Sequence, residues 1–173
     1  MTVKDPRQIP AIGFLTVCEF ADQGWFGGYL IVNAIGRPLE FHCTAPVKPN
    51  RAQEILYGST LRPYVFGEQI GQTLVRKGRL EPLFVCTDLE PMLVVRDFID
   101  PPALLVLGEE PPTLPSALLE FTLGAHDVAV STAWATDREN LVRVWQSIND
   151  NLDLLEPFAR IRGAIEEARK SAA

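Results

Sequence analysis

Histidine and cysteine are scarce in this chain of 173 residues, which has two histidines and three cysteines. Cys18, Cys43 and Cys86 are an odd number of thiols, and no two of them stand at the C-x-x-C spacing of structural zinc sites. The sequence therefore predicts neither a metal site nor a disulfide framework. Unpaired thiols are typical of the reducing cytoplasm, where we expect the protein to reside.

Sequence motifs for common cofactors and catalytic groups are also lacking. The chain contains no G-x-G-x-x-G or G-x-x-x-x-G-K-[ST] loop for phosphates, no G-x-S-x-G nucleophile and no H-E-x-x-H zinc helix. We therefore expect no cofactor. With only two histidines, the chain also has few candidates for a histidine that acts as a general acid or base.

Basic charge and long apolar runs are lacking as well. Sixteen Lys and Arg against 22 Asp and Glu give a net charge of −6, which argues against a broad basic surface for nucleic acid. No apolar run approaches the ~20 residues of a membrane span, and the first residues, MTVKDPRQIPAIGF, lack the order of a secretory signal. We expect a soluble protein that binds neither nucleic acid nor membrane.

What the chain does contain is enough apolar material for one core. Hydrophobic residues make up 47% of it, which suits a single globular domain of ordinary size. We expect residues 1–10 to form an N-terminal arm and residues 11–173 to form one domain. A connection at 100–115 holds five prolines, as is typical of a long surface segment.

The apolar pattern changes between two periods along the chain. Runs of β-branched and aromatic residues predict strands at 11–20, 28–36, 38–47 and 82–88, an edge strand at 103–107, and a hairpin of 116–124 and 126–134. Spacings of three or four predict helices at 51–57, just after Gly58, at 89–99, from Thr136 to Leu155, and at 158–170. The sequence thus predicts the α+β class, with one mainly antiparallel sheet of five or six of these seven segments, flanking helices and a long C-terminal helical segment.

One group of residues could carry chemistry. Cys86 and Asp88 lie where a predicted strand meets a predicted helix, which is where a thiol pKa can be lowered. His42 lies beside Glu40 on the polar face of another strand. In an enzyme, Cys86 would be the nucleophile and Asp88 or His42 the base. The alternative is that Cys86 is buried and Asp88 caps the helix.

A second group could bind a ligand. Lys48, Arg51 and the free N–H groups of the helix that Asn50 caps, with Gln53 in the capping-box position, could hold an anion. Glu54 is a further ligand-binding candidate in the same helix. The alternative is a solvated turn before a capped helix.

Four aromatic residues are candidates for an interface. Trp25 and Phe26 lie at the predicted tip of a loop, and Trp145 and Phe158 lie on the apolar stripe of the C-terminal helices. The alternative is that all four pack into the core.

Two hypotheses of function follow. The lack of catalytic motifs favours a non-enzymatic interaction or accessory module that binds a protein partner or forms a homodimer. The alternative is a small enzyme or anionic-ligand-binding protein, with a pocket near the ends of the third and fourth strands.

Overall fold

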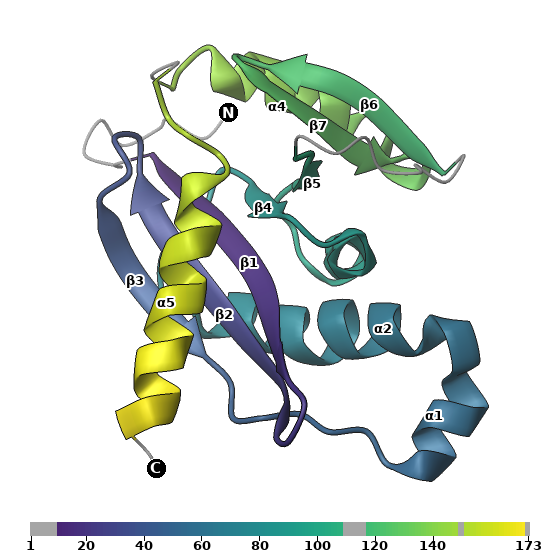
Figure 1. Cartoon of the computed structure of the whole chain (residues 1–173). Helices are drawn as coiled ribbons and strands as arrows, with labels where there is room; N and C mark the ends of the chain where they lie inside the picture. The colour runs from purple at the N-terminus through teal and green to yellow at the C-terminus, as the bar shows by residue number, and fades with distance from the viewer. Residues whose placement is uncertain (1–9, 109–116, 149–150, 172–173) are drawn as a thin grey trace.

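The computed structural model describes residues 10–108, 117–148 and 151–171. In these ranges seven strands form a single sheet in the order β3-β2-β1-β4-β5-β7-β6 (Figure 1). Strands from both sides of the proline-rich connection belong to this sheet, and the connection's residues 109–116 lie outside the described ranges. The strands are β1 (Ala11–Phe20), β2 (Gly24–Asn33), β3 (Pro38–Cys43), β4 (Val85–Thr87), β5 (Ala103–Val106), β6 (Leu118–Leu123) and β7 (His126–Ser131).

The sheet is mixed and has seven strands, so the prediction of five or six mainly antiparallel strands was wrong in the number of strands and in the direction of the central ones. β4 pairs in parallel with β1 and with β5, while the other neighbours are antiparallel. Both central strands are short and buried throughout, as is usual for parallel strands covered on both faces. The predicted edge strand at 103–107 therefore lies inside the sheet, between β4 and β7.

The helices also depart from the prediction at two places. The segment expected as an α-helix at 89–99 is the 3₁₀ helix η3 (Glu90–Phe98). The helix expected from Thr136 to Leu155 is the shorter α4 (Asp137–Trp145), whereas the helix expected at 158–170 is present as α5 (Glu156–Ser171). The remaining helical elements are α1 (Arg51–Tyr57), η1 (Gly58–Thr60), α2 (Leu61–Pro63), the π-helical η2 (Tyr64–Gly71), α3 (Gln72–Lys77) and η4 (Thr132–Trp134).

Helices cover both faces of the sheet. On one face, α4 and α5 pack against apolar side chains that include Phe14, Leu30 and Cys86. On the other face, the α2–α3 segment and η3 pack against a second apolar cluster that includes Leu15 and Tyr29. Among the described residues, no helix combines the length and the apolar character that crossing a membrane requires.

Two adjacent glycines in β2 let helices approach the sheet from both sides. A Cβ on Gly27 would lie 2.1 Å from Cγ2 of Ile70 in η2, and a Cβ on Gly28 would lie 2.3 Å from Cγ2 of Ile161 in α5. Consecutive residues of a strand point to opposite faces, so each glycine serves one helix. A larger residue at either position requires the facing isoleucine or its helix to shift.

We predict that Gly28→Ala lowers the free energy of unfolding by about 1–3 kcal/mol, because the added methyl overpacks the contact with α5. Urea denaturation measures this change. Gly163→Ala in α5 is the matched control, since nothing lies within 4 Å of a Cβ at that position. It should raise the free energy of unfolding by up to about 1 kcal/mol. Wild-type stability of Gly28→Ala would contradict the close packing.

Candidate functional site

His42 has a structural partner rather than an open site. It lies on the edge strand β3, and its Nε2 is 3.2 Å from Oε1 of Glu40. The Glu40 carboxylate also accepts the backbone N–H groups of Arg79 at 2.9 Å and of Leu80 at 2.8 Å. The pair thus fastens the loop after α3 to the edge of the sheet, which is a packing role that the sequence did not reveal.

The same contacts shift the ionisation of Glu40. Burial acts to raise the pKa of this carboxyl, but the backbone hydrogen bonds from Arg79 and Leu80 and the contact with His42 outweigh it and lower the pKa. A group whose pKa is lowered on folding stabilises the protein above its unfolded pKa. That contribution is lost as the pH falls through the folded value.

We therefore predict that Glu40→Gln costs about 1 kcal/mol of unfolding free energy at pH 7, and that the difference from wild type shrinks by pH 3. Urea denaturation at the two pH values tests this. Glu54→Gln is the control, because its pair with Arg51 is exposed and such pairs contribute little. An equal loss from Glu40→Gln at both pH values would show that the charge of Glu40 is not what matters.

Cys86 is a core residue. It is 0% exposed and belongs to the apolar cluster under α4 and α5, and burial raises the pKa of its thiol well above the ordinary value. Three strand spacings of about 4.8 Å, roughly 14 Å, separate β3 from β4. His42 and Cys86 also lie on opposite faces, because His42 pairs with Tyr29 and Cys86 pairs with Phe14. The two residues do not meet in a common site.

Asp88 does not cap a helix but joins a polar cluster with two residues that the sequence did not single out. The hydroxyl of the buried Thr16 in β1 donates to Oδ1 of Asp88 at 2.7 Å, and Arg162 of α5 pairs with Oδ2. The hydroxyl of Thr87 instead accepts the backbone N–H of Leu89 at 3.2 Å. The cluster lies at the carboxyl end of β4, where its parallel pairing with β1 ends. Open sheets often bind ligands at such ends, but here the Asp88 carboxylate is already paired with Arg162.

The predicted anion site is a capped helix start. Asn50 and Gln53 form both hydrogen bonds of a capping box, and Arg51 pairs with Glu54 at 3.3 Å on the surface. Lys48 is exposed. The helix α1, which carries Arg51 and Glu54, projects away from the sheet and from β4 (Figure 1).

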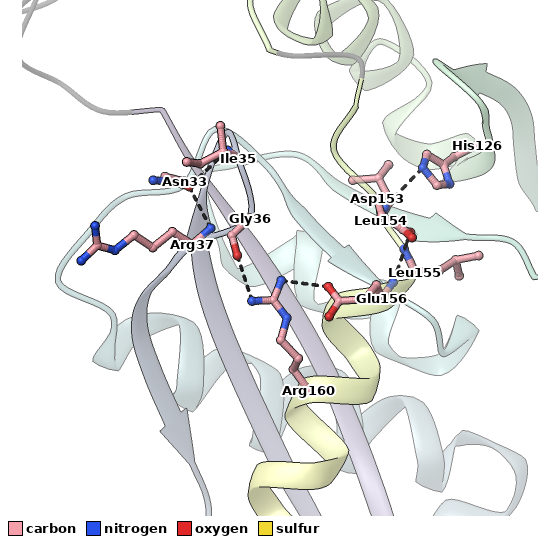
Figure 2. Close-up of polar contacts among 10 residues, drawn as sticks. All are labelled: Asn33, Ile35, Gly36, Arg37, His126, Asp153, Leu154, Leu155, Glu156 and Arg160. Atoms are coloured by element: carbon pink, nitrogen blue, oxygen red, sulfur yellow. Dashed lines mark hydrogen bonds and ion pairs between the residues drawn. The ribbon is translucent and has the colours of Figure 1, made fainter.

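A hollow of about 440 Å³ lies beside the N-terminus of α5, next to the β2–β3 turn. Figure 2 shows Arg160 bridging this junction, with Nη1 donating to the carbonyl of Gly36 at 2.8 Å and Nη2 3.0 Å from Glu156. Asp153 accepts the backbone N–H groups of Leu155 and Glu156. The hydrogen bond from Arg160 to Gly36 therefore holds the start of α5 to the β2–β3 turn.

Three of the four aromatic candidates lie in the core. Trp25 is in β2 rather than at a loop tip, is 8% exposed, and stands edge-on to Phe66. Trp145 of α4 and Phe158 of α5 are buried in the first apolar cluster. Phe26 is half-buried. The structure places none of these four rings prominently on the surface.

The most exposed apolar side chains in a helix lie instead on α1. This helix has no buried residue, yet Ile55 is 66% exposed and Leu56 is 83% exposed. Beside them, Tyr57 and Tyr64 stack with ring centroids 4.2 Å apart. We call Ile55, Leu56, Tyr57, Leu61 and Tyr64 the α1 surface. Leu61 and Tyr64 follow α1 in the chain and also pack against the second apolar cluster, whereas α1 itself projects from one end of the molecule (Figure 1).

The α1 surface was missed at the level of sequence. The signal was the run Ile55-Leu56-Tyr57 in a helix of seven residues. Three consecutive residues on a helix point in different directions, so they cannot all face one core.

Comparison with known proteins gives no family. No protein-family model matches the chain, and no curated protein matches it. Among solved structures, an Argonaute of Marinitoga piezophila in complex with a 5′ OH guide RNA is 12% identical, with the match covering 72% of this chain and 23% of the Argonaute. Its TM-score of 0.32 is too low to support a conclusion about fold or function.

Proposed function

We propose that this protein is a non-enzymatic interaction module that self-associates through the α1 surface. The observation that carries the proposal is a helix without any buried residue that presents Ile55 and Leu56 to solvent. Covering exposed apolar side chains removes them from water, which is favourable, so a partner that packs against this helix would lower the free energy of the system. A helix of seven residues is also marginal on its own, so a partner would stabilise α1 itself.

A second copy suits this surface as the partner. Two-fold association places the same patch against itself, and the α1 surface is apolar and therefore complementary to itself. Arg51 and Glu54 at its border carry opposite charges, so two copies do not meet with like charge alone. Five side chains are fewer than the roughly 20–30 residues that a standard interface uses on each side, and the dimer should accordingly be weak.

The arrangement of the polar residues supports a role without catalysis. Cys86 is buried, His42 is held by Glu40, and Asp88 is paired with Arg162. These groups belong to separate parts of the sheet and do not surround one reacting atom.

The three free cysteines support our placing the protein in the cytoplasm.

We predict that wild-type protein approaches twice its 19.2 kDa mass as its concentration rises, and that Ile55→Ser with Leu56→Lys stays monomeric. Sedimentation velocity over a concentration series measures this. The double variant should keep its unfolding free energy within about 0.5 kcal/mol, because both sites are exposed.

Val142→Lys is the matched control, since Val142 is an exposed apolar residue on α4, 40% exposed and outside the α1 surface. It should leave self-association unchanged. A wild-type chain that stays monomeric throughout, or a double variant that associates like wild type, would contradict the proposal.

A further inference from the structure

A second feature lies on the opposite side of the sheet from the α2–α3 segment. A pocket of about 240 Å³ opens between the β2–β3 pair and the C-terminal turns of α5. Its walls are mostly apolar and include Phe26, Pro46, Ile165 and Ala168. None of its lining residues is acidic.

The pocket arises from the path of the chain on each side. Gly28 brings α5 close to β2 through Ile161 and Ile165, which fixes the roof of the pocket. At the end of β3, Thr44 is held to Gly27 by two hydrogen bonds, of 3.0 Å from its N–H and 2.9 Å to its hydroxyl. The pocket is therefore built by the sheet and the helix rather than by a loose loop.

A single cation stands at the edge of this apolar wall. The guanidinium of Arg169 lies over the ring of Phe20 at 4.2 Å, and Phe20 packs edge-on against Phe26 with centroids 5.3 Å apart. Phe26 lines the pocket, so the contacts from Phe26 to Phe20 and from Phe20 to Arg169 hold the guanidinium next to the cavity.

Arg169 keeps part of its hydrogen-bonding capacity for a ligand. Its Nε is buried without a hydrogen-bond partner in the described chain, so a ligand would meet the two Nη groups rather than Nε. Its Nη2 forms an ion pair with Oε1 of Glu166 at 3.6 Å, which is longer than a normal hydrogen bond, so a bound carboxylate would share the guanidinium with Glu166. An arginine fork with unused donors is suited to a carboxylate, which can accept two parallel N–H bonds.

We propose that this pocket binds a small carboxylic acid, with its apolar body against Phe26 and Ile165 and its carboxylate paired with Arg169. The argument is independent of the α1 surface, which lies on another part of the molecule. Apolar walls provide the binding free energy, and the single charged group sets the orientation and the preference for an anion.

Cys43 provides a built-in reporter for occupancy. It is exposed and lines the pocket. Cys86 is buried, and burial is the main cause that raises the pKa of the half-buried Cys18 thiol. Alkylation with iodoacetamide near neutral pH should accordingly modify Cys43 first, since the thiolate is the reactive form.

The experiment measures the rate of Cys43 alkylation by mass spectrometry, with octanoate, octylamine or octanol as probes in separate samples. A ligand of this size binds with a Kd on the order of 1 mM. Octanoate at that concentration should roughly halve the rate, while octylamine and octanol should have much smaller effects. Equal protection by all three probes, or protection by none, would overturn the proposal.

Variants on α5 sharpen the test, with each rate compared with and without octanoate in the same variant. Arg169→Gln should reduce octanoate protection to the level of octanol, and Ala168→Phe, which fills the pocket from an exposed helix position, should abolish it. Lys170→Gln removes a neighbouring exposed cation outside the pocket and should leave protection intact. Full protection in Arg169→Gln would show that the carboxylate does not bind there.

Discussion

The packing of helices on both sides of Gly27 and Gly28 is the constraint on which the rest of the structure depends. These two residues of β2 face opposite layers, and each admits an isoleucine at a distance that no Cβ allows. The approach of α5 on one side fixes the roof of the apolar pocket and sets Arg162 beside Asp88. The approach of η2 on the other side fixes the helical segment from which α1 projects (Figure 1).

Polar residues that resemble catalytic groups are used to fasten elements together. Glu40 and His42 hold a loop to the edge strand, and Thr16, Asp88 and Arg162 hold α5 to the sheet. Arg96 pairs with the buried Asp137 at 2.7 Å and so joins η3 to the start of α4. Buried charges are tolerated when they are paired in this way, and side chains already paired have little capacity left for a substrate.

Local features of the fold could be predicted from the sequence, but the sheet order could not. The run at 11–20 matches β1, and the capping box of Asn50 and Gln53 starts α1 as expected. The parallel pairing of β4 with β1 depends on contacts between distant segments, and strands of three and four residues carry little pattern of their own.

The candidate site was less predictable still. For the aromatic interface candidates both the surface and the core were open, and three of the four lie in the core, because a sequence does not show which apolar stripe a sheet will cover. The pocket beside the end of β3 contains none of the residues that the sequence suggested for a ligand site, and its charged residue is Arg169, more than 100 positions from Cys43. Neither the position of Arg169 in the sequence nor the residues around it predict that Arg169 lies beside β3.

The central claim is that α1 is completed by a partner copy. Amide hydrogen exchange over residues 51–57, measured at low and high protein concentration, tests it most directly. The account predicts fast exchange in dilute protein, because α1 has no buried residue and a helix this short is marginal alone. It predicts slower exchange at high concentration, with no change in α5. Exchange of α1 that is the same at every concentration would contradict the account.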